Sequence, residues 1–341
     1  MFKKYLTAIL LLVLTLSLCG LLAACGDKGT GQVSFTVAEL TPILANTIYE
    51  YTEAEERLDG WSYFWETTDG PYYQRRVADS IGPRWVELYL LTDEDFALVY
   101  GNEVPYTLYH QYFANEPPNM GSMILRGTIE LGAEWLFAAW ESGDYDTAEV
   151  TAVGLNVKTP FATFRDAVEI TINYYTGETA KQYYAKDYGL VRTVFYNEDG
   201  EVASEFVLAN IIENTVFKTE APFFFPDENG ELDFEVVTIE YTTHANFNEI
   251  FLNTAREFYS NKFGIEINGD LQINSVRFNR DPDELTVNID FSAELTDELK
   301  KAGERVDEFL TAVKFTVSNF YRAFHDVVIT VDGEAFALDA A

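Results

Sequence analysis

Cysteine and histidine are scarce in this chain of 341 residues, which holds two cysteines and three histidines. Cys19 and Cys25 both lie near the N-terminus, so the sequence offers no framework of disulfides along the chain. His110, His244 and His325 lie in separate segments, whereas a histidine-based metal site needs at least two at helical or hairpin spacing. We therefore expect no metal or other cofactor, and a fold held together by burial of apolar side chains.

Basic residues are also few: 23 Lys and Arg stand against 56 Asp and Glu, which gives a formal net charge of −33. This balance argues against nucleic acid as a partner, because Lys and Arg supply the affinity for phosphate. It argues equally against electrostatic binding to anionic lipids. The acidic turns at 197–200 and 227–230 lack the alternating carboxylates of an EF-hand loop, so we interpret both as hairpin turns.

Recognisable catalytic motifs are missing from the sequence. It contains no Gly-x-Ser-x-Gly motif and no glycine-rich loop of the Walker or Rossmann type. With 56 acidic residues, two neighbouring carboxylates are no sign of a glycosidase pair. We therefore expect a protein that is not an enzyme and has no catalytic residues.

The N-terminal residues have the three zones of a secretory signal peptide. Residues 1–4 are basic, residues 5–18 are almost entirely apolar, and small residues precede Cys25. An uncleaved membrane anchor is disfavoured because the apolar stretch is borderline for a span, which needs about 20 residues. A Cys19–Cys25 disulfide is disfavoured because Cys19 lies inside the apolar zone.

The string Leu22-Ala23-Ala24-Cys25-Gly26 resembles the lipobox of bacterial lipoproteins. The resemblance implies that the Cys25 thiol is diacylated and that the signal peptide, 1–24, is cleaved between Ala24 and Cys25. Two acyl chains suffice for stable anchoring, and residues 25–36 would form the lipidated tether. The expected location is the outer face of the cytoplasmic membrane, in a Gram-positive envelope rather than a Gram-negative one, although the latter stays open.

The sequence predicts a β-rich domain over 37–215, with an N-terminal helix over 37–57 where apolar residues recur every three or four positions. Between 127 and 207, short strands with turns about every ten residues predict an antiparallel meander. The strings TPFATFRDAVEIT and KQYYAKDYGLVRTVF resemble a β-repeat of Gram-positive lipoproteins, with related pieces in LolA/LolB-type carriers. That resemblance implies a concave sheet. The aromatic run 61–65 could line a ligand groove, but alternating aromatics on a strand favour a core.

A linker is expected over 216–233, where prolines, aromatics and a turn are mixed, followed by a second domain over 234–341. The predicted element order of that domain is βαββαβ, which favours a split α/β sandwich with two helices on one face. The fold class is therefore α+β. The predicted strands lie at 235–241, 271–278, 285–291 and 327–331, and the helices at 246–262 and 306–324.

Three strings in this second domain, VNIDFS at 287–292, TVSNF at 316–320 and VVITVDG at 327–333, resemble the GerMN domain of sporulation and spore-germination lipoproteins. The resemblance implies modules that associate side by side through a helix face and a sheet edge. Asp290 and Ser292 could be functional there. We favour the interpretation that Asp290 ends an edge strand and that Ser292 caps the following segment.

Two functions follow from these features. The first is a non-enzymatic scaffold for protein interactions, anchored to the membrane through Cys25 and binding itself or other envelope proteins. The GerMN resemblance implies a role in sporulation or germination. The alternative is a carrier that holds a lipid or another apolar ligand in the concave sheet of the first domain.

Overall fold

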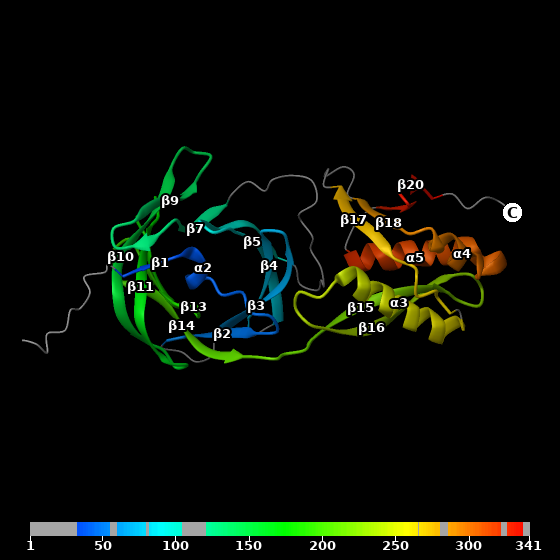
Figure 1. Ribbon diagram of the computed structural model, residues 1–341, viewed down its shortest axis with the longest axis horizontal. Coiled ribbons are helices and arrows are strands. Elements are labelled where there is room, and N and C mark those ends of the chain that lie inside the picture. The colour runs from blue at the N-terminus through cyan, green and yellow to red at the C-terminus, as the bar shows by residue number, and fades with distance from the viewer. Residues whose placement is uncertain are drawn as a thin grey trace, which may run out of the picture.

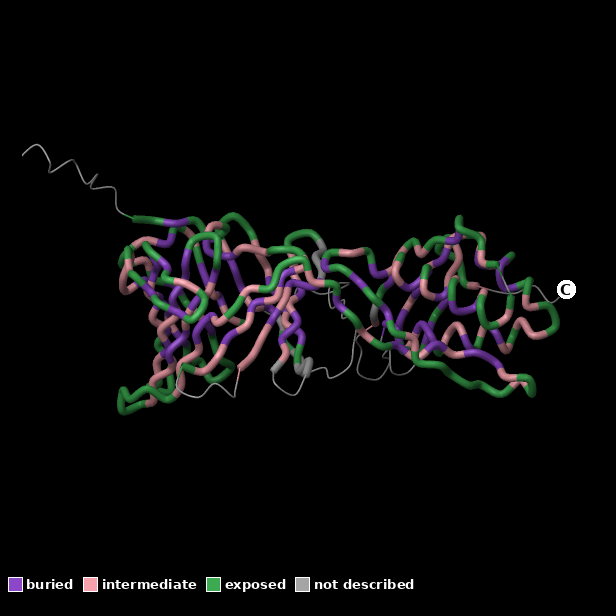
Figure 2. The backbone as a smooth tube through the Cα atoms, turned by 90° about the horizontal axis from the view of Figure 1, so that it is seen from below, coloured by how far each residue is buried: buried purple, intermediate pink, exposed green. Residues whose placement is uncertain are grey.

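The computed structural model describes residues 33–54, 60–79, 82–103, 121–264, 266–279, 286–321 and 326–336. A strongly curved β-sheet forms the N-terminal part, residues 33–212, and a mixed α/β structure forms the C-terminal part, residues 217–336 (Figure 1). Buried residues run through the interior of both parts (Figure 2). Among the described residues, no helix is long and apolar enough to cross a membrane. Ala24 and Cys25 lie outside the described residues.

Twelve antiparallel strands form the sheet of the N-terminal part, in the order β7-β6-β5-β4-β3-β2-β14-β13-β12-β11-β10-β9. Two meanders of sequential neighbours are joined where β2 pairs with β14. The meander predicted over 127–207 is confirmed. The strands are β2 (Ile48–Glu53), β3 (Gly60–Asp69), β4 (Tyr72–Asp79), β5 (Gly82–Leu91), β6 (Asp95–Glu103), β7 (Ser122–Arg126), β9 (Glu134–Ala139), β10 (Tyr145–Lys158), β11 (Thr163–Asn173), β12 (Thr179–Ala185), β13 (Gly189–Tyr196) and β14 (Val202–Ile212).

The sheet curves until its two edge strands, β7 and β9, contact each other (Figure 1). At this contact the indole Nε1 of Trp135 donates a hydrogen bond to the carbonyl oxygen of Met123, at 2.9 Å. Register shifts interrupt several strand pairs, including three between β10 and β11. Such irregularities increase the local bend and twist of a sheet, which accounts for the strong curvature.

The N-terminal segment fills the inside of this curve (Figure 1). Strand β1 (Ser34–Phe35) pairs with β8 (Ile129–Glu130), and helix α2 (Val37–Leu40) follows with Val37 and Leu40 fully buried. The helix predicted over 37–57 is wrong, because α2 has four residues and residues 48–53 form β2. Pro42 stops the helix early, since it lacks an N–H and disfavours helical backbone at the residue before it.

The C-terminal part holds the strands and helices predicted over 234–341, so the α+β class is confirmed in outline. Its elements form two separate sheets, β15-β16 and β17-β18-β19-β20, with the helices packed between and around them. They are β15 (Phe217–Pro226), β16 (Leu232–Tyr241), α3 (Phe247–Phe263), β17 (Ile273–Asn279), β18 (Thr286–Phe291), α4 (Glu294–Lys300), the 3₁₀ turn Gly303–Arg305, α5 (Val306–Tyr321), β19 (Asp326–Val331) and β20 (Glu334–Ala335).

The segment expected as a linker, 216–233, is instead mostly strand. Residues 217–226 form β15, which pairs with β16 over ten residue pairs without a register shift. Phe217, Phe223 and Phe225 of β15 are buried in the core of the C-terminal part. Strand β16 therefore has its own partner and does not join the sheet of β17–β20, as a single split sheet would require.

A buried polar cluster joins the two parts of the molecule. The carboxylate of Glu66 on β3, with no exposure to solvent, accepts hydrogen bonds from Gln74, Arg76 and, from the C-terminal part, the hydroxyl of Tyr241 at 2.9 Å. Beside it, the ring of Phe64 stacks on that of Phe217 with 3.9 Å between centroids. Charged and apolar contacts thus fix β3 against the β15–β16 hairpin.

Candidate functional site

The hairpin of β15 and β16 has two edges of different character, and its hydrogen-bond pattern defines which residues face each edge. At the turn, the Asp227 N–H donates to the Glu231 carbonyl oxygen at 2.8 Å, so this is a hydrogen-bonded pair. In an antiparallel ladder such pairs alternate with pairs whose N–H and C=O groups point outward. Pro222 and Val236 form one outward-pointing pair, and Phe224 and Phe234 form the next.

The outer edge of β15 is closed. Pro222 and Pro226 occupy outward-pointing positions and have no N–H to offer. Between them, the Phe224 N–H donates to the hydroxyl of Thr316 on α5 at 2.9 Å, and the Phe224 carbonyl oxygen accepts from the hydroxyl of Tyr259 on α3, also at 2.9 Å. Over residues 222–226, the edge of β15 is therefore unavailable to another strand.

The outer edge of β16 is open. The alternation directs the N–H and C=O groups of Val236, Thr238 and Glu240 away from β15. Within the described part of the chain, these backbone groups have no hydrogen-bond partner, whereas the Phe234 N–H bonds to the carboxylate of Asp233 at 2.8 Å. Unpaired strand edges of this kind readily accept an additional strand.

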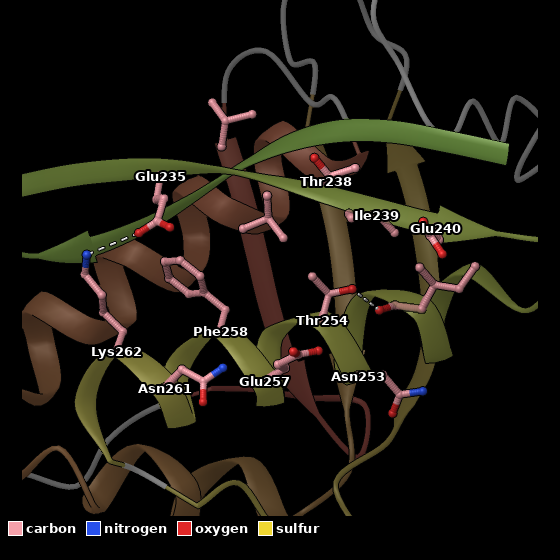
Figure 3. Close-up of a pocket in the computed structure, with 13 residues that line it drawn as sticks. Glu235, Thr238, Ile239, Glu240, Asn253, Thr254, Glu257, Phe258, Asn261 and Lys262 are labelled. Atoms are coloured by element: carbon pink, nitrogen blue, oxygen red, sulfur yellow. Dashed lines mark hydrogen bonds and ion pairs between the residues drawn. The ribbon is translucent and has the colours of Figure 1, made fainter.

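This open edge borders a groove of about 830 Å³ between β16 and α3 (Figure 3). Residues 235–240 form one wall, and α3 forms the other. Asn253, Glu257 and Asn261, spaced four residues apart, lie on one exposed side of α3 along the groove. At one end, the ammonium of Lys262 lies 3.3 Å from the carboxylate of Glu235 and 4.0 Å from the ring centre of Phe225.

Acidic side chains dominate the charge of the groove. Among the described residues that line it, Glu235, Glu240 and Glu257 stand against one cation, Lys262. Glu240 is paired with Lys218 on β15 at 2.5 Å, and Glu235 is paired with Lys262. Among the described residues, no Lys or Arg forms an ion pair with Glu257. The groove is therefore suited chemically to a ligand that carries positive charge.

Inside the curved sheet, the described residues line a much smaller cavity of about 90 Å³. Arg75 lies beside it, between the rings of Tyr63 and Tyr89 and in an ion pair with Glu87. Burial lowers the pKa of the Arg75 guanidinium, but Glu87, Tyr89 and Tyr63 together outweigh burial and the pKa is raised. The arginine thus stays charged and already has its partners. Ligand pockets commonly measure about 300–1,000 Å³, so this cavity is small for a ligand.

The aromatic run 61–65 belongs to the core, as favoured from the sequence. Tyr63 and Trp65 are buried inside the curved sheet, where Tyr63 stacks on Tyr49 with ring centres 4.9 Å apart. Phe64 points the other way, to the junction with Phe217. Tyr63 and Trp65 border the small interior cavity and do not reach the groove.

Asp290 and Ser292 have structural roles in the C-terminal part. Asp290 lies on β18, which runs between β17 and β19, so its expected place on an edge strand is wrong. Its carboxylate accepts hydrogen bonds from Thr330 at 2.6 Å and from the Gly333 N–H at 2.8 Å. The hydroxyl of Ser292 accepts from the Gln272 N–H at 3.0 Å, while α4 has Ala293 as its N-cap residue without a side-chain cap.

The remaining residues singled out in the sequence form no site. His244 follows β16, and His110 and His325, like Ala24 and Cys25, lie outside the described residues. In the described ranges, no group of three or more His, Cys, Asp or Glu side chains is arranged to hold a metal ion. The groove was missed because 216–233 was interpreted as a linker. The even spacing of Pro222 and Pro226 in an aromatic run is the signal that predicts an edge strand there.

A scan against protein-family models found no match for the chain, and a search of curated proteins found none either. Among solved structures, the chain is similar to "a putative lipoprotein from Parabacteroides distasonis", with 14% identity and a TM-score of 0.29, over 51% of this chain and 98% of that one. It is also similar to "a putative exported protein with YmcC-like fold" from Bacteroides fragilis, with 14% identity and a TM-score of 0.30, over 51% and 99%. Likenesses at this level carry no argument about function.

Proposed function

We propose that the protein is a lipid-anchored, non-enzymatic interaction module on the outer face of the cytoplasmic membrane, and that the β16–α3 groove binds its partner. The observation that carries the proposal is an 830 Å³ groove next to an unpaired strand edge. The anchor is supported by the basic, apolar and small-residue zones before Cys25. Acylation of Cys25 would hold the groove near the membrane, where other envelope proteins are concentrated.

The alternative function, a carrier of an apolar ligand, has less support. The concave face of the sheet is occupied by α2 and by buried aromatic side chains, and its cavity of about 90 Å³ is too small for an acyl chain. The link to sporulation or germination depends on the GerMN resemblance, whose strings lie in β18, α5 and β19 and include many core positions. It stays a prediction.

The anchor is tested by comparing wild-type protein with Cys25→Ser in the native host. We expect the wild type in the membrane fraction, with a mass increase at the N-terminal peptide that corresponds to a diacylglyceryl group. The Cys25→Ser variant should lack that mass and keep the signal peptide. Two N-terminal peptides that differ in mass only by the replacement of sulfur with oxygen would contradict lipidation.

The groove is tested with a photoreactive amino acid placed at Asn253 and, as a matched control, at Glu198 on the exposed β13–β14 turn. Irradiation of intact cells should join Asn253, but not Glu198, to one protein. Absence of a protein adduct at Asn253, together with a bound apolar molecule in native mass spectrometry, would replace the interaction module by the carrier.

A further inference from the structure

We infer that the β16–α3 groove binds an extended, basic segment of a partner protein, which adds to β16 as a third strand. This inference rests on the function proposed above and names the chemistry of the partner. The groove follows residues 235–240, and an antiparallel strand rises about 3.4 Å per residue. It therefore accommodates about six residues of extended chain. The outward N–H and C=O groups of Val236, Thr238 and Glu240 supply the backbone hydrogen bonds of such a complex.

The acidic side chains of the groove favour a ligand with positive charge. Side chains of an added strand alternate between its two faces, so every second one would lie on the α3 side. There it would meet Glu257, which has no ion-pair partner among the described residues, and Glu235. Lys or Arg at such a position would form an ion pair with Glu257, whereas Glu235 already pairs with Lys262. Acidic residues would be repelled.

The other face of the added strand would meet the side chains of Phe234 and Val236 toward the hairpin turn, and those of Thr238 and Glu240 beyond them. Phe234 and Val236 of β16 are 55% and 53% exposed, and they point away from α3. Because these two side chains are exposed, apolar ligand residues opposite them would remove apolar surface from water. The ligand that fits the groove thus carries a basic residue toward Glu257 and apolar residues opposite Phe234 and Val236.

A second copy of this chain is a poor occupant. Strand β16 carries Asp233, Glu235 and Glu240 and contains no Lys or Arg. Pairing of β16 with β16 would gather three carboxylates from each copy in one ribbon, and like charges across strands are destabilising. The net charge of −33 adds repulsion between the two copies. The partner is therefore a different, basic chain.

The test uses the full mature chain with Cys25→Ser and a fluorescein-labelled peptide of alternating Lys and Val, seven residues long. Binding is measured by fluorescence anisotropy. A peptide of alternating Glu and Val is the charge control, and a Lys–Val peptide with N-methylated Val is the backbone control. We expect saturable binding of the Lys–Val peptide, and weaker binding by about tenfold or more for both controls, the equivalent of one or two lost hydrogen bonds.

Two matched variants test the strand edge. Thr238→Pro removes an outward N–H without touching the ladder to β15, as Pro222 does on the other strand, while Thr238→Val keeps the N–H. We expect Thr238→Pro to weaken binding by about tenfold and Thr238→Val to leave it within about twofold. Glu257→Gln should weaken it by about two- to fivefold, the range of an exposed ion pair. Equal affinities for Thr238→Pro and Thr238→Val would overturn the inference.

Hydrogen exchange is measured on the wild type, so this test does not depend on whether a variant folds. Peptide binding should slow exchange of the Val236, Thr238 and Glu240 amides and leave the Phe224 amide, already bonded to Thr316, unchanged. Unchanged exchange at β16 would overturn strand addition.

If the crosslink from Asn253 to a partner persists in Thr238→Pro, strand addition is wrong while the proposed function stands. If no crosslink forms at Asn253 at all, the proposed function itself fails.

Discussion

Asp290 shows how one carboxylate holds the end of a sheet. Hydrogen bonds from Thr330, from the Gly333 N–H and from Asn274 converge on it, and they lower the pKa of its carboxyl below the ordinary value of 3.8. Gly333 belongs to the two-residue turn between β19 and β20, where both Asp332 and Gly333 have positive φ. The carboxylate thus ties the β18 strand to a turn that few residues other than Asp, Asn and Gly can form.

We predict that Asp290→Asn changes the pH dependence of stability. Because the pKa of Asp290 is lowered in the folded state, its ionised form stabilises the fold above the unfolded pKa, about 3.9. This contribution is lost as the pH falls through the folded pKa. The difference in unfolding free energy between wild type and Asp290→Asn should therefore be largest at pH 7 and shrink below pH 4, as measured by urea titration. A difference that stays constant down to pH 2.5 would contradict it.

At the scale of elements, the short helix α2 lies inside the curved sheet and packs in its core. Its N-cap Thr36 and Glu39 form a capping box, and the Glu39 carboxylate also pairs with Lys186 beside the β12–β13 turn at 2.7 Å. This fastens the segment inside the sheet. Leu40 is fully buried and lines the small cavity.

We predict that Leu40→Ala destabilises the protein by about 2–5 kcal/mol, because it removes buried methyl groups and enlarges a cavity. Leu44→Ala is the matched control, since Leu44 is 40% exposed, and it should cost less than about 1 kcal/mol. Chemical unfolding followed by tryptophan fluorescence measures both. Equal losses for the two variants would show that Leu40 does not fill the interior.

The sequence predicts most strands of this fold because short runs of β-branched and aromatic residues alternate between turns. The prediction from sequence fails in two segments in which proline residues determine the backbone structure. The periodic apolar residues of 37–57 favour a helix, but Pro42 ends it and the alternation of Tyr49 and Tyr51 belongs to β2. Pro222 and Pro226 favour a linker, but both lie where a strand needs no N–H. The spacing of these two prolines is the local signal of β15, but the groove is formed by the packing of β16 against α3, which local sequence does not specify.

The whole molecule is joined by the buried cluster around Glu66. Arg76 and Glu66 form an ion pair at 2.8 Å, and their side chains are 6% and 0% exposed. Burial and the neighbouring Glu66 raise the pKa of Tyr241, so its hydroxyl keeps the proton that it donates. Two backbone contacts reinforce the junction: the His244 N–H donates to the Glu66 carbonyl, and the Thr243 N–H to the side chain of Asn46, both at 2.8 Å.

We predict that the two parts unfold together in the wild type and separately in Glu66→Ala. Removal of the carboxylate leaves Arg76 buried without its charge partner, which costs about 3–5 kcal/mol. Differential scanning calorimetry should show one transition for the wild type and two for the variant. Glu198→Ala, an exposed acid far from the junction in sequence, is the control. A single transition in Glu66→Ala, shifted as little as in Glu198→Ala, would contradict the role of the cluster.

The closed edge of β15 has a consequence for crowding at a membrane. If Cys25 is acylated as proposed, the chains would be held at high local density. A hairpin with two open edges could then dock head to tail, β16 of one molecule on β15 of the next. Such a contact does not close on itself, and it grows into a fibre. Pro222 and Pro226 offer no N–H on the β15 side, and the backbone groups of Phe224 between them are already bonded. Residues 222–226 of β15 therefore oppose the growth of a fibre through this hairpin.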